Sequence, residues 1–402
     1  MQESSKIAIT GTGIISAIGN NSEENYQSLE QSRHGIKDIH ILDTFYKGKL
    51  LAGEVNFTNE QLYSILELDS SKAYTRTSLL ALWAAKEAVA SSGLDLNDGF
   101  STGLISATTV GGMDASEKYY YEYLVSDEHL AYIPTHHCGY HTEQLAEELG
   151  ITGFTTTIST ACSSAANAIM LGARMIKAGI LDRVVVGGAD SLSKFTLNGF
   201  NSLMIFSDEH CKPFDQNRKG LNLGEAAAYL VLESEECVKK QNKEVLAYLS
   251  GYGNANDAFH QTASSDEGDG AFLAIQKALE VSGLQPEDID YINVHGTATP
   301  NNDLTEGKAI LRAFGGKESL PDFSSTKAFT GHTLAAAGAV EAVFSVLALQ
   351  NQVIFPNLNF FDTIEELYIR PETEFRSKKI ENILSNSLGF GGNCSALIFS
   401  QK

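Results

Sequence analysis

The sequence lacks paired cysteines, long apolar runs and an excess of basic residues, and each absence excludes a class of protein. Its five cysteines are widely spaced and form no CxxC pair, so we expect no disulfide framework and a reducing cytoplasm. No stretch approaches the ~18 apolar residues that a membrane-spanning helix needs. Lysine and arginine number 29 against 50 aspartates and glutamates, a net charge of −21. A surface of that charge repels nucleic acid and anionic membranes, so neither is an expected partner.

Three local patterns that resemble targeting, cofactor or metal motifs do not meet the physical requirements of those motifs. Residues 7–13 are too short and too glycine-broken for a signal peptide. The Gly11-Thr12-Gly13 turn lacks the third glycine of a dinucleotide fingerprint. His136, His137, Cys138 and His141 include zinc ligand types, but adjacent histidines cannot easily point at one metal, and no second ligand cluster appears. We therefore predict neither a bound cofactor nor a metal.

The order of the expected elements predicts an α/β protein built from two similar halves. Buried strands alternate with helices, the pattern of covered, largely parallel sheets. Residues 86–94 resemble residues 277–284, and each segment precedes a buried strand, which indicates a duplicated unit. A charged stretch at 233–245 marks the seam. We predict a first half over residues 1–244 and a second half over 245–402.

The chain is organised around a cysteine between a predicted strand and a predicted helix. Four β-branched residues, 155–158, predict a short buried strand, and residues 165–178 predict a buried helix. Cys162 lies at the turn between them, where free N–H groups and the helix dipole favour a thiolate. A small buried cysteine that only fills space is the alternative, and this stretch alone leaves it open.

In the second half, three further motifs contain the residues that could do chemistry, and each motif lies at the end of an expected strand. His295 follows one strand, Lys327 and His332 precede a small-residue helix, and the turn 386–393 is rich in glycine. Strand ends converge on one side of an α/β sheet, so these residues and Cys162 would share a pocket. A thiolate can carry an acyl group, and neutral histidines can donate hydrogen bonds to a developing oxyanion. For each histidine alone, a structural role is about as plausible.

Together these motifs carry a resemblance to a known family. The segments that match are Thr160-Ala161-Cys162-Ser163-Ser164, His295-Gly296-Thr297-Ala298-Thr299-Pro300, Lys327-Ala328-Phe329-Thr330-Gly331-His332 and Gly389-Phe390-Gly391-Gly392. The chain resembles the β-ketoacyl-acyl carrier protein synthases, the elongating decarboxylating enzymes of the thiolase superfamily, over nearly its whole length. The resemblance implies a duplicated thiolase-like fold of αβαβα layers, with two mixed sheets around buried helices.

Carried over by position, the resemblance implies a catalytic set. Cys162 would be the acyl-accepting nucleophile, and His295 and His332 would polarise the malonyl thioester carbonyl and stabilise the enolate left by decarboxylation. Lys327, paired with Glu341, would order the site. No cofactor is implied beyond the phosphopantetheine that arrives on the carrier protein.

A second group of residues would hold the substrate. The backbone N–H groups of Phe390 and Cys162 would form the oxyanion hole, and the Phe390 ring would gate the acyl pocket. Val110 lies where the family sets acyl-chain depth across a dimer interface. The residues expected to bind the substrate or its pantetheine arm are Thr297, Thr299, Thr262, Val110 and Gly391.

The implied partners are acyl and malonyl forms of an acyl carrier protein, with a homodimer expected and a heterodimer possible. The acidic carrier needs a local basic patch, for which Lys72 and Arg76 are candidates, although a solvated helix face is as plausible. One alternative function is a chain-length-determining partner subunit, which typically lacks the cysteine. Another is a thiolase, for which Cys394 is the only candidate second cysteine; a packing role for Cys394 is the default.

Overall fold

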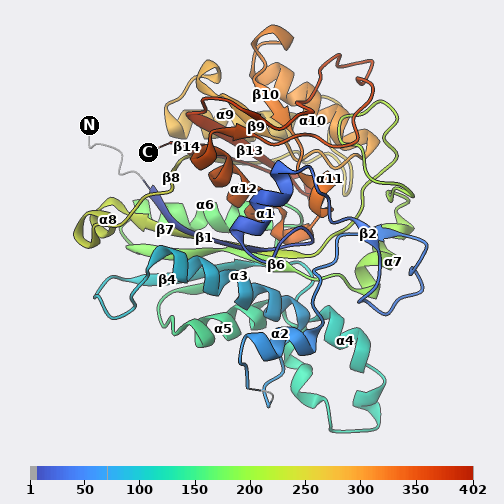
Figure 1. The fold of residues 1–402 in the computed structure, drawn as a ribbon, viewed down its shortest axis with the longest axis vertical. Coiled ribbons are helices and arrows are strands. Elements are labelled where there is room, and N and C mark those ends of the chain that lie inside the picture. Colours follow the sequence, from blue (N-terminus) through green and yellow to red (C-terminus); the bar gives the residue numbers. More distant parts are fainter. Residues whose placement is uncertain (1–6, 70, 402) are drawn as a thin grey trace.

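Within the described part of the chain, ten strands form one mixed sheet on which the other elements are built (Figure 1). The computed structural model describes residues 7–69 and 71–401. In chain order the strands of this sheet are β1 (Ile7–Ile15), β4 (Thr102–Ala107), β5 (Thr155–Ile158), β6 (Arg183–Asp190), β7 (Ala226–Ser234), β8 (Ala247–Asn256), β9 (Tyr291–Asn293), β10 (Asp322–Ser324), β13 (Asn382–Leu388) and β14 (Asn393–Ser400). Two small ribbons pair β2 (Lys37–Asp38) with β3 (Leu51–Ala52) and β11 (Val353–Ile354) with β12 (Arg376–Ser377).

The strand order repeats between the two halves of the sheet. The first half runs β5-β4-β6-β7-β1 and the second β10-β9-β13-β14-β8, each with three parallel strands followed by two antiparallel ones. The halves join where Ile7–Ile9 of β1 pairs with Ala247–Leu249 of β8. The predicted α/β fold is therefore confirmed, with its two mixed sheets continuous through this short junction. The division at residues 244/245 stays a prediction.

Helices cover both faces of each half and give the predicted layers. They are α1 (Ser22–Glu30), α2 (Asn59–Ile65), α3 (Arg76–Ser92), α4 (Met113–Tyr119), α5 (Cys138–Leu149), α6 (Ser164–Lys177), α7 (Lys194–Ser202), α8 (Glu235–Gln241), α9 (Asp269–Ser282), α10 (Pro300–Ala313), α11 (Lys327–Thr330) and α12 (Ala337–Asn351). In Figure 1, α6 and α12 lie between the two halves of the sheet, α3 covers the outer face of one half and α9 that of the other. Short 3₁₀ helices are η1 (Glu122–Leu124), η2 (Leu130–Tyr132), η3 (Pro134–His136), η4 (Pro286–Asp288), η5 (Lys317–Ser319), η6 (Leu334–Ala336) and η7 (Phe390–Gly392).

The central layer is the largest core and explains the small-residue composition of its helices. Alanine-rich faces of α6 and α12 pack on each other and on the inner faces of both sheet halves. The expectation that no stretch could span a membrane is wrong for Leu334–Asn351, which is long and apolar enough by length and composition alone, but 89% of it is buried inside the protein. It is therefore a core helix, and its apolar character comes from its central position.

The strand before Cys162 differs from its prediction in burial. β5 spans the predicted residues, but its four side chains are half-buried. The reason is its place at the end of the sheet, where β4 is its only strand neighbour among the described residues. The predicted helix that follows is confirmed as α6, with most of its residues buried.

The contact between the two central helices predicts a stability effect. A Cβ on Gly338 of α12 would lie 2.8 Å from the backbone nitrogen of Ala166 on α6, closer than side chains approach. We expect Gly338→Ala to lower the free energy of unfolding by about 1–3 kcal/mol, measured by chemical denaturation. Gly199→Ala on α7 is the control, because no atom lies within 4 Å of its added Cβ. Equal stability of the two variants would contradict the packing described.

Candidate active site

Cys162 lies on a strained turn that leads from β5 into α6. Ala161, the preceding residue, has φ +53°, a left-handed conformation that alanine adopts at a cost. The Ser164 hydroxyl fixes this turn, because it donates to the Ala161 carbonyl (2.5 Å) and accepts from the Thr160 N–H (2.8 Å). The Cys162 side chain is only 6% exposed. The turn therefore presents the thiol to an enclosed space.

A buried lysine orders the two histidines that the sequence singled out. Lys327, the first residue of α11, forms an ion pair with Glu341 of α12. Its ammonium also donates to the His295 carbonyl (2.5 Å) and lies 3.2 Å from Nδ1 of the same residue. His332 receives a hydrogen bond at Nδ1 from the Leu334 N–H (3.0 Å). The imidazole centroids are 5.3 Å apart, with the rings nearly perpendicular.

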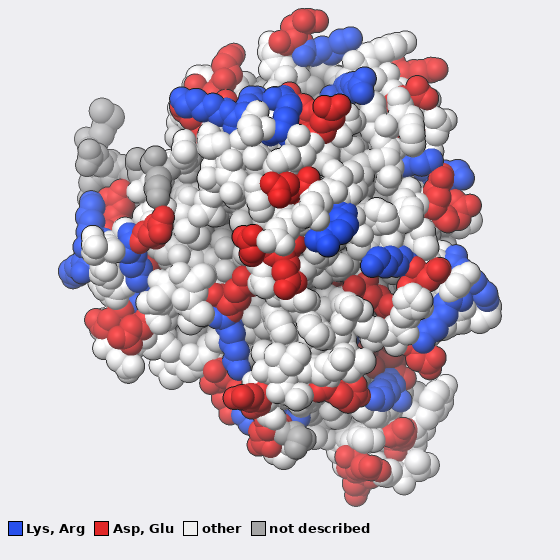
Figure 2. Space-filling view, in the orientation of Figure 1, with Lys and Arg blue, Asp and Glu red and all other residues white. Residues whose placement is uncertain are grey.

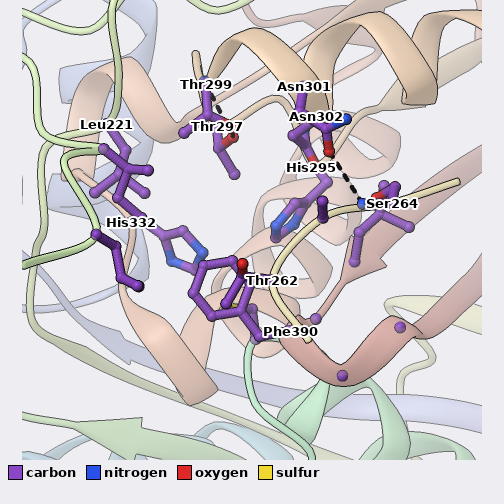
Figure 3. A pocket seen from close by; sticks show the side chains of 18 of the residues that line it. Leu221, Thr262, Ser264, His295, Thr297, Thr299, Asn301, Asn302, His332 and Phe390 are labelled. Carbon is purple, nitrogen blue, oxygen red and sulfur yellow. Dashed lines mark hydrogen bonds between the residues drawn. The ribbon is translucent and has the colours of Figure 1, made fainter. Parts of the chain in front are cut away.

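These contacts fix where each histidine carries its proton. An ammonium has donors only, so the His295 Nδ1 beside Lys327 acts as an acceptor, as does Nδ1 of His332. Burial, and then the charge of Lys327, hold the pKa of both histidines well below the ordinary value. Each ring is therefore neutral near pH 7 and carries its hydrogen on Nε2. Figure 3 shows both rings pointing into the space that Phe390 and Thr262 border.

The pocket is a cavity of about 300 Å³ that collects most of the predicted residues. Cys162, His295, His332 and Phe390 line it. Its further polar lining includes Thr262, Ser264, Thr297, Thr299, Asn301, Asn302 and the backbone of Gly391. Lys327 and Glu341 do not line it and lie buried behind the histidines. Asn301 and Asn302 were missed by the sequence reasoning, although they directly follow the His295 motif.

A second, apolar chamber of about 340 Å³ begins at the same cysteine. Val110, the predicted chain-depth residue, lies in its wall together with Leu334. The two cavities share Cys162, Phe200, Leu203 and Phe390, and the two phenylalanine rings stack with centroids 5.9 Å apart. The stacked rings therefore border both spaces. Phe200 was missed because no motif surrounds it.

The pKa of Cys162 corrects the prediction of a thiolate. Burial raises the pKa of the thiol to about 11, although the charge of Lys327 and a hydrogen bond from the Phe390 backbone both lower it. The helix begins only at Ser164, and the free N–H groups of its first turn do not outweigh the cost of burying an anion. The resting site therefore holds a neutral thiol. Burial similarly raises the pKa of Glu341 to about 7, with Lys327 opposing the shift.

The proposed docking patch is wrong. Arg76 is only 7% exposed, and its guanidinium makes paired hydrogen bonds to Glu225 at 2.8 and 2.6 Å. Lys72 forms ion pairs with Glu147 and Glu148, which cancel its charge. On the face drawn in Figure 2, acidic and basic side chains are interspersed.

The remaining histidines and cysteines make separate structural contacts. His136 pairs with Ser116, whereas the buried His141 pairs with Ser106 and the Cys138 carbonyl. Among the described residues no group of three or more histidine, cysteine or acidic side chains is placed to hold a metal. Cys394 lines the same pocket as Cys162 but is 3% exposed, and burial raises its pKa to about 12.

The raised pKa of Cys162 gives a testable pH dependence. Only the thiolate reacts with iodoacetamide, so the logarithm of the alkylation rate should rise with a slope of about one per pH unit from pH 7 to 10. An ordinary exposed thiol would approach a plateau near pH 9. Peptide mass spectrometry assigns the adduct, and the Cys162→Ser variant is the control. A plateau at or below pH 9 would contradict the burial argument.

Comparison with known proteins identifies the family of the chain. The family model “Beta-ketoacyl synthase, N-terminal domain” matches residues 4–237, and “Beta-ketoacyl synthase, C-terminal domain” matches residues 246–361. The 3-oxoacyl-(acyl-carrier-protein) synthase 2 of Staphylococcus aureus (strain N315) is 32% identical over 414 residues, covering 100% of this chain and 99% of the relative. The protein of the same name from Coxiella burnetii is 33% identical, covering 99% of each chain.

Solved structures extend the likeness to the fold. The ishigamide ketosynthase/chain length factor superposes with a TM-score of 0.92 at 29% identity and covers 100% of both chains. A ketosynthase in complex with its chain length factor from Xenorhabdus doucetiae gives a TM-score of 0.86 at 31% identity, covering 99% of this chain and 98% of the other. With family models that match most of its length and relatives above 30% identity along all of it, the chain belongs to the beta-ketoacyl synthase family.

Proposed function

We propose that this chain condenses a malonyl thioester with an acyl group held on Cys162, losing CO₂ and releasing a β-ketoacyl thioester. One observation carries the proposal: a buried thiol and two neutral histidines with Nε2–H donors face one cavity, and an apolar chamber opens from the same thiol. The first cavity suits a polar carrier arm and a thioester. The second suits a hydrocarbon chain.

Acyl transfer comes first. The Cys162 sulfur attacks the carbonyl of an acyl thioester, a carbon–sulfur bond forms, and the carrier thiolate leaves with the thiol proton. The N–H groups of Cys162 and Phe390 are assigned to the oxyanion of the tetrahedral intermediate. The new thioester is uncharged, so the buried position that disfavours a thiolate tolerates the acylated cysteine.

Decarboxylation and condensation follow. The bond between the malonyl carboxylate and its α-carbon breaks, CO₂ leaves, and the electron pair becomes an enolate. The Nε2–H groups of His295 and His332 donate to the enolate oxygen, and Lys327 keeps the His295 proton on Nε2. The α-carbon then attacks the Cys162 thioester, a carbon–carbon bond forms, and the sulfur leaves and regains a proton.

The carrier arm and the acyl chain are assigned to different cavities. Thr297 and Thr299, whose hydroxyls lie 2.9 Å apart, would hydrogen-bond the phosphopantetheine arm with Thr262 opposite (Figure 3). The backbone of Gly391 would border the thioester, and Phe390 would move aside to admit the chain. Val110 would set the depth of the apolar chamber.

The proposed partners are an acyl carrier protein and a second copy of this chain, in the cytoplasm that the cysteine content favours. One side of β5 pairs with β4, and the other pairs with no strand among the described residues, which leaves an edge that could pair with another chain. Apolar side chains lie exposed at Phe154 (42%) and Tyr121 (79%). A heterodimer with a chain-length subunit would use the same edge. A role for the chain itself as such a subunit is disfavoured because it has Cys162 and both histidines. A thiolase is disfavoured because Lys327 with His332 favours decarboxylation.

Acylation of Cys162 is the first test. Incubation with an acyl-carrier thioester should add one acyl mass to the wild-type protein at Cys162, measured by peptide mass spectrometry. Cys162→Ala should lose the adduct and all chain extension, while some release of CO₂ from malonyl-carrier survives, because the histidines remain. Cys394→Ala is the matched control and should keep the adduct. No adduct on the wild type would support a partner-subunit role instead.

The histidine donors give a second test. In the Cys162→Ala background, where decarboxylation is isolated from acyl transfer, His295→Ala or His332→Ala should slow release of CO₂ by about 10²-fold, since each removes one donor to the enolate. His210→Ala, which changes a histidine outside both cavities, should leave the rate unchanged. Unaltered decarboxylation in both active-site variants would refute the assigned roles.

A further inference from the structure

A buried carboxylate at the end of β6 holds one wall of the apolar chamber. Asp190 has no exposed surface. Its Oδ1 accepts hydrogen bonds from the Thr108 hydroxyl (2.5 Å), the Thr109 N–H (3.0 Å) and the Val110 N–H (3.2 Å). Thr109 and Val110 line the chamber. One oxygen of Asp190 therefore fixes the loop after β4.

The other oxygen holds the opposite segment. Oδ2 accepts from the Ala335 N–H at 2.8 Å, and also from the Thr109 hydroxyl. Ala335 belongs to η6, next to Leu334, which lines the same chamber and has φ +54°. These walls come from different halves of the sheet, so the carboxylate joins segments more than 140 residues apart in the chain.

Only a carboxylate accepts on both oxygens at this position. Burial raises the pKa of Asp190, and the hydrogen bonds from both walls oppose that rise. An amide of the same shape presents one acceptor and one donor, so either the Ala335 N–H or the loop after β4 would face a donor. A buried N–H left without an acceptor costs more than the bond it loses.

We propose that Asp190 is a positioning residue that sets the spacing of the chamber walls and thereby selects the length of the acyl chain. This inference rests on the proposed function, because it assigns the chamber to an acyl chain. Asp190 lines neither cavity and touches no reacting atom. It acts through Val110 and Leu334.

The experiment compares Asp190→Asn with the wild type across a series of saturated acyl-carrier thioesters, from butyryl to hexadecanoyl. The ratio between the highest and lowest kcat/KM in the series measures chain-length selection. We expect this ratio to fall at least about 5-fold, since loss of a buried charged acceptor frees one wall. The Asp190 charge also raises the pKa of Cys162, but its loss would change kcat/KM by the same factor for every chain length and leave the ratio unaltered.

We call the hydrogen bonds that Asp190 accepts from residues 108–110 and from Ala335 the clamp. Two further variants separate the effect of the clamp from that of general destabilisation. Glu87→Gln is the matched control: its carboxylate also bridges two backbone N–H groups, those of Ile14 and Ser22 (both 2.8 Å), but away from the chamber. It should lower stability without changing the ratio. Thr108 lies outside the chamber lining, and Thr108→Val removes its hydrogen bond to Asp190 together with the acceptor of the Gly111 N–H (3.1 Å). It should lower the ratio less than Asp190→Asn.

The outcomes are distinct for the two proposals. If the wild type condenses and Asp190→Asn keeps the wild-type chain-length ratio, the proposed role of Asp190 is wrong but the proposed function is unaffected. An equal fall of the ratio in Glu87→Gln would also overturn the proposed role of Asp190. If Asp190→Asn does not fold, an unchanged ratio in Thr108→Val decides against the clamp. Absence of acylation in the wild type rejects the proposed function itself.

Discussion

One buried ammonium, that of Lys327, sets the electrical state of the active site. Its charge is balanced by Glu341, and its hydrogens reach both the carbonyl and Nδ1 of His295. Because an ammonium only donates, His295 can present only a donor to the cavity. The same charge lowers the pKa of both histidines and that of Cys162. Neutral Nε2–H donors can stabilise a transient enolate without handing it a full proton, and in the proposed cycle the Cys162 sulfur already carries the acyl group at that stage.

The duplicated fold explains how these groups meet. The first half contributes Cys162 after β5, and the second contributes His295 after β9, Lys327 after β10 and Phe390 after β13. Equivalent strand ends of two similar halves face each other across the central helices, so the site lies between the halves. Asp190 crosses the same boundary by hydrogen bonds from both sides. The apolar chamber is thus built from both halves as well.

At this site, burial outweighs the effects that local sequence features predict for Cys162 and Arg76. The helix-dipole argument for Cys162 is sound in sign, yet desolvation is larger and raises the pKa of the thiol. Arg76 is a second example. A basic residue at a helix start predicts a surface patch, but in the structure the guanidinium is buried and hydrogen-bonded to Glu225. In both cases the sequence shows the group, and its depth in the protein determines what the group does.

The sequence alone determined the α/β class, the repeat and the ordered motifs around Cys162, His295, Lys327 and the Phe390 turn, because these are local patterns along the chain. Tertiary structure decided which of those residues face the cavity and which stand behind it. It also decided the protonation states, the half-buried edge at β5 and the clamp at Asp190. These properties depend on contacts between segments far apart in sequence and on distance from water, and neither leaves a periodic or local mark in the chain.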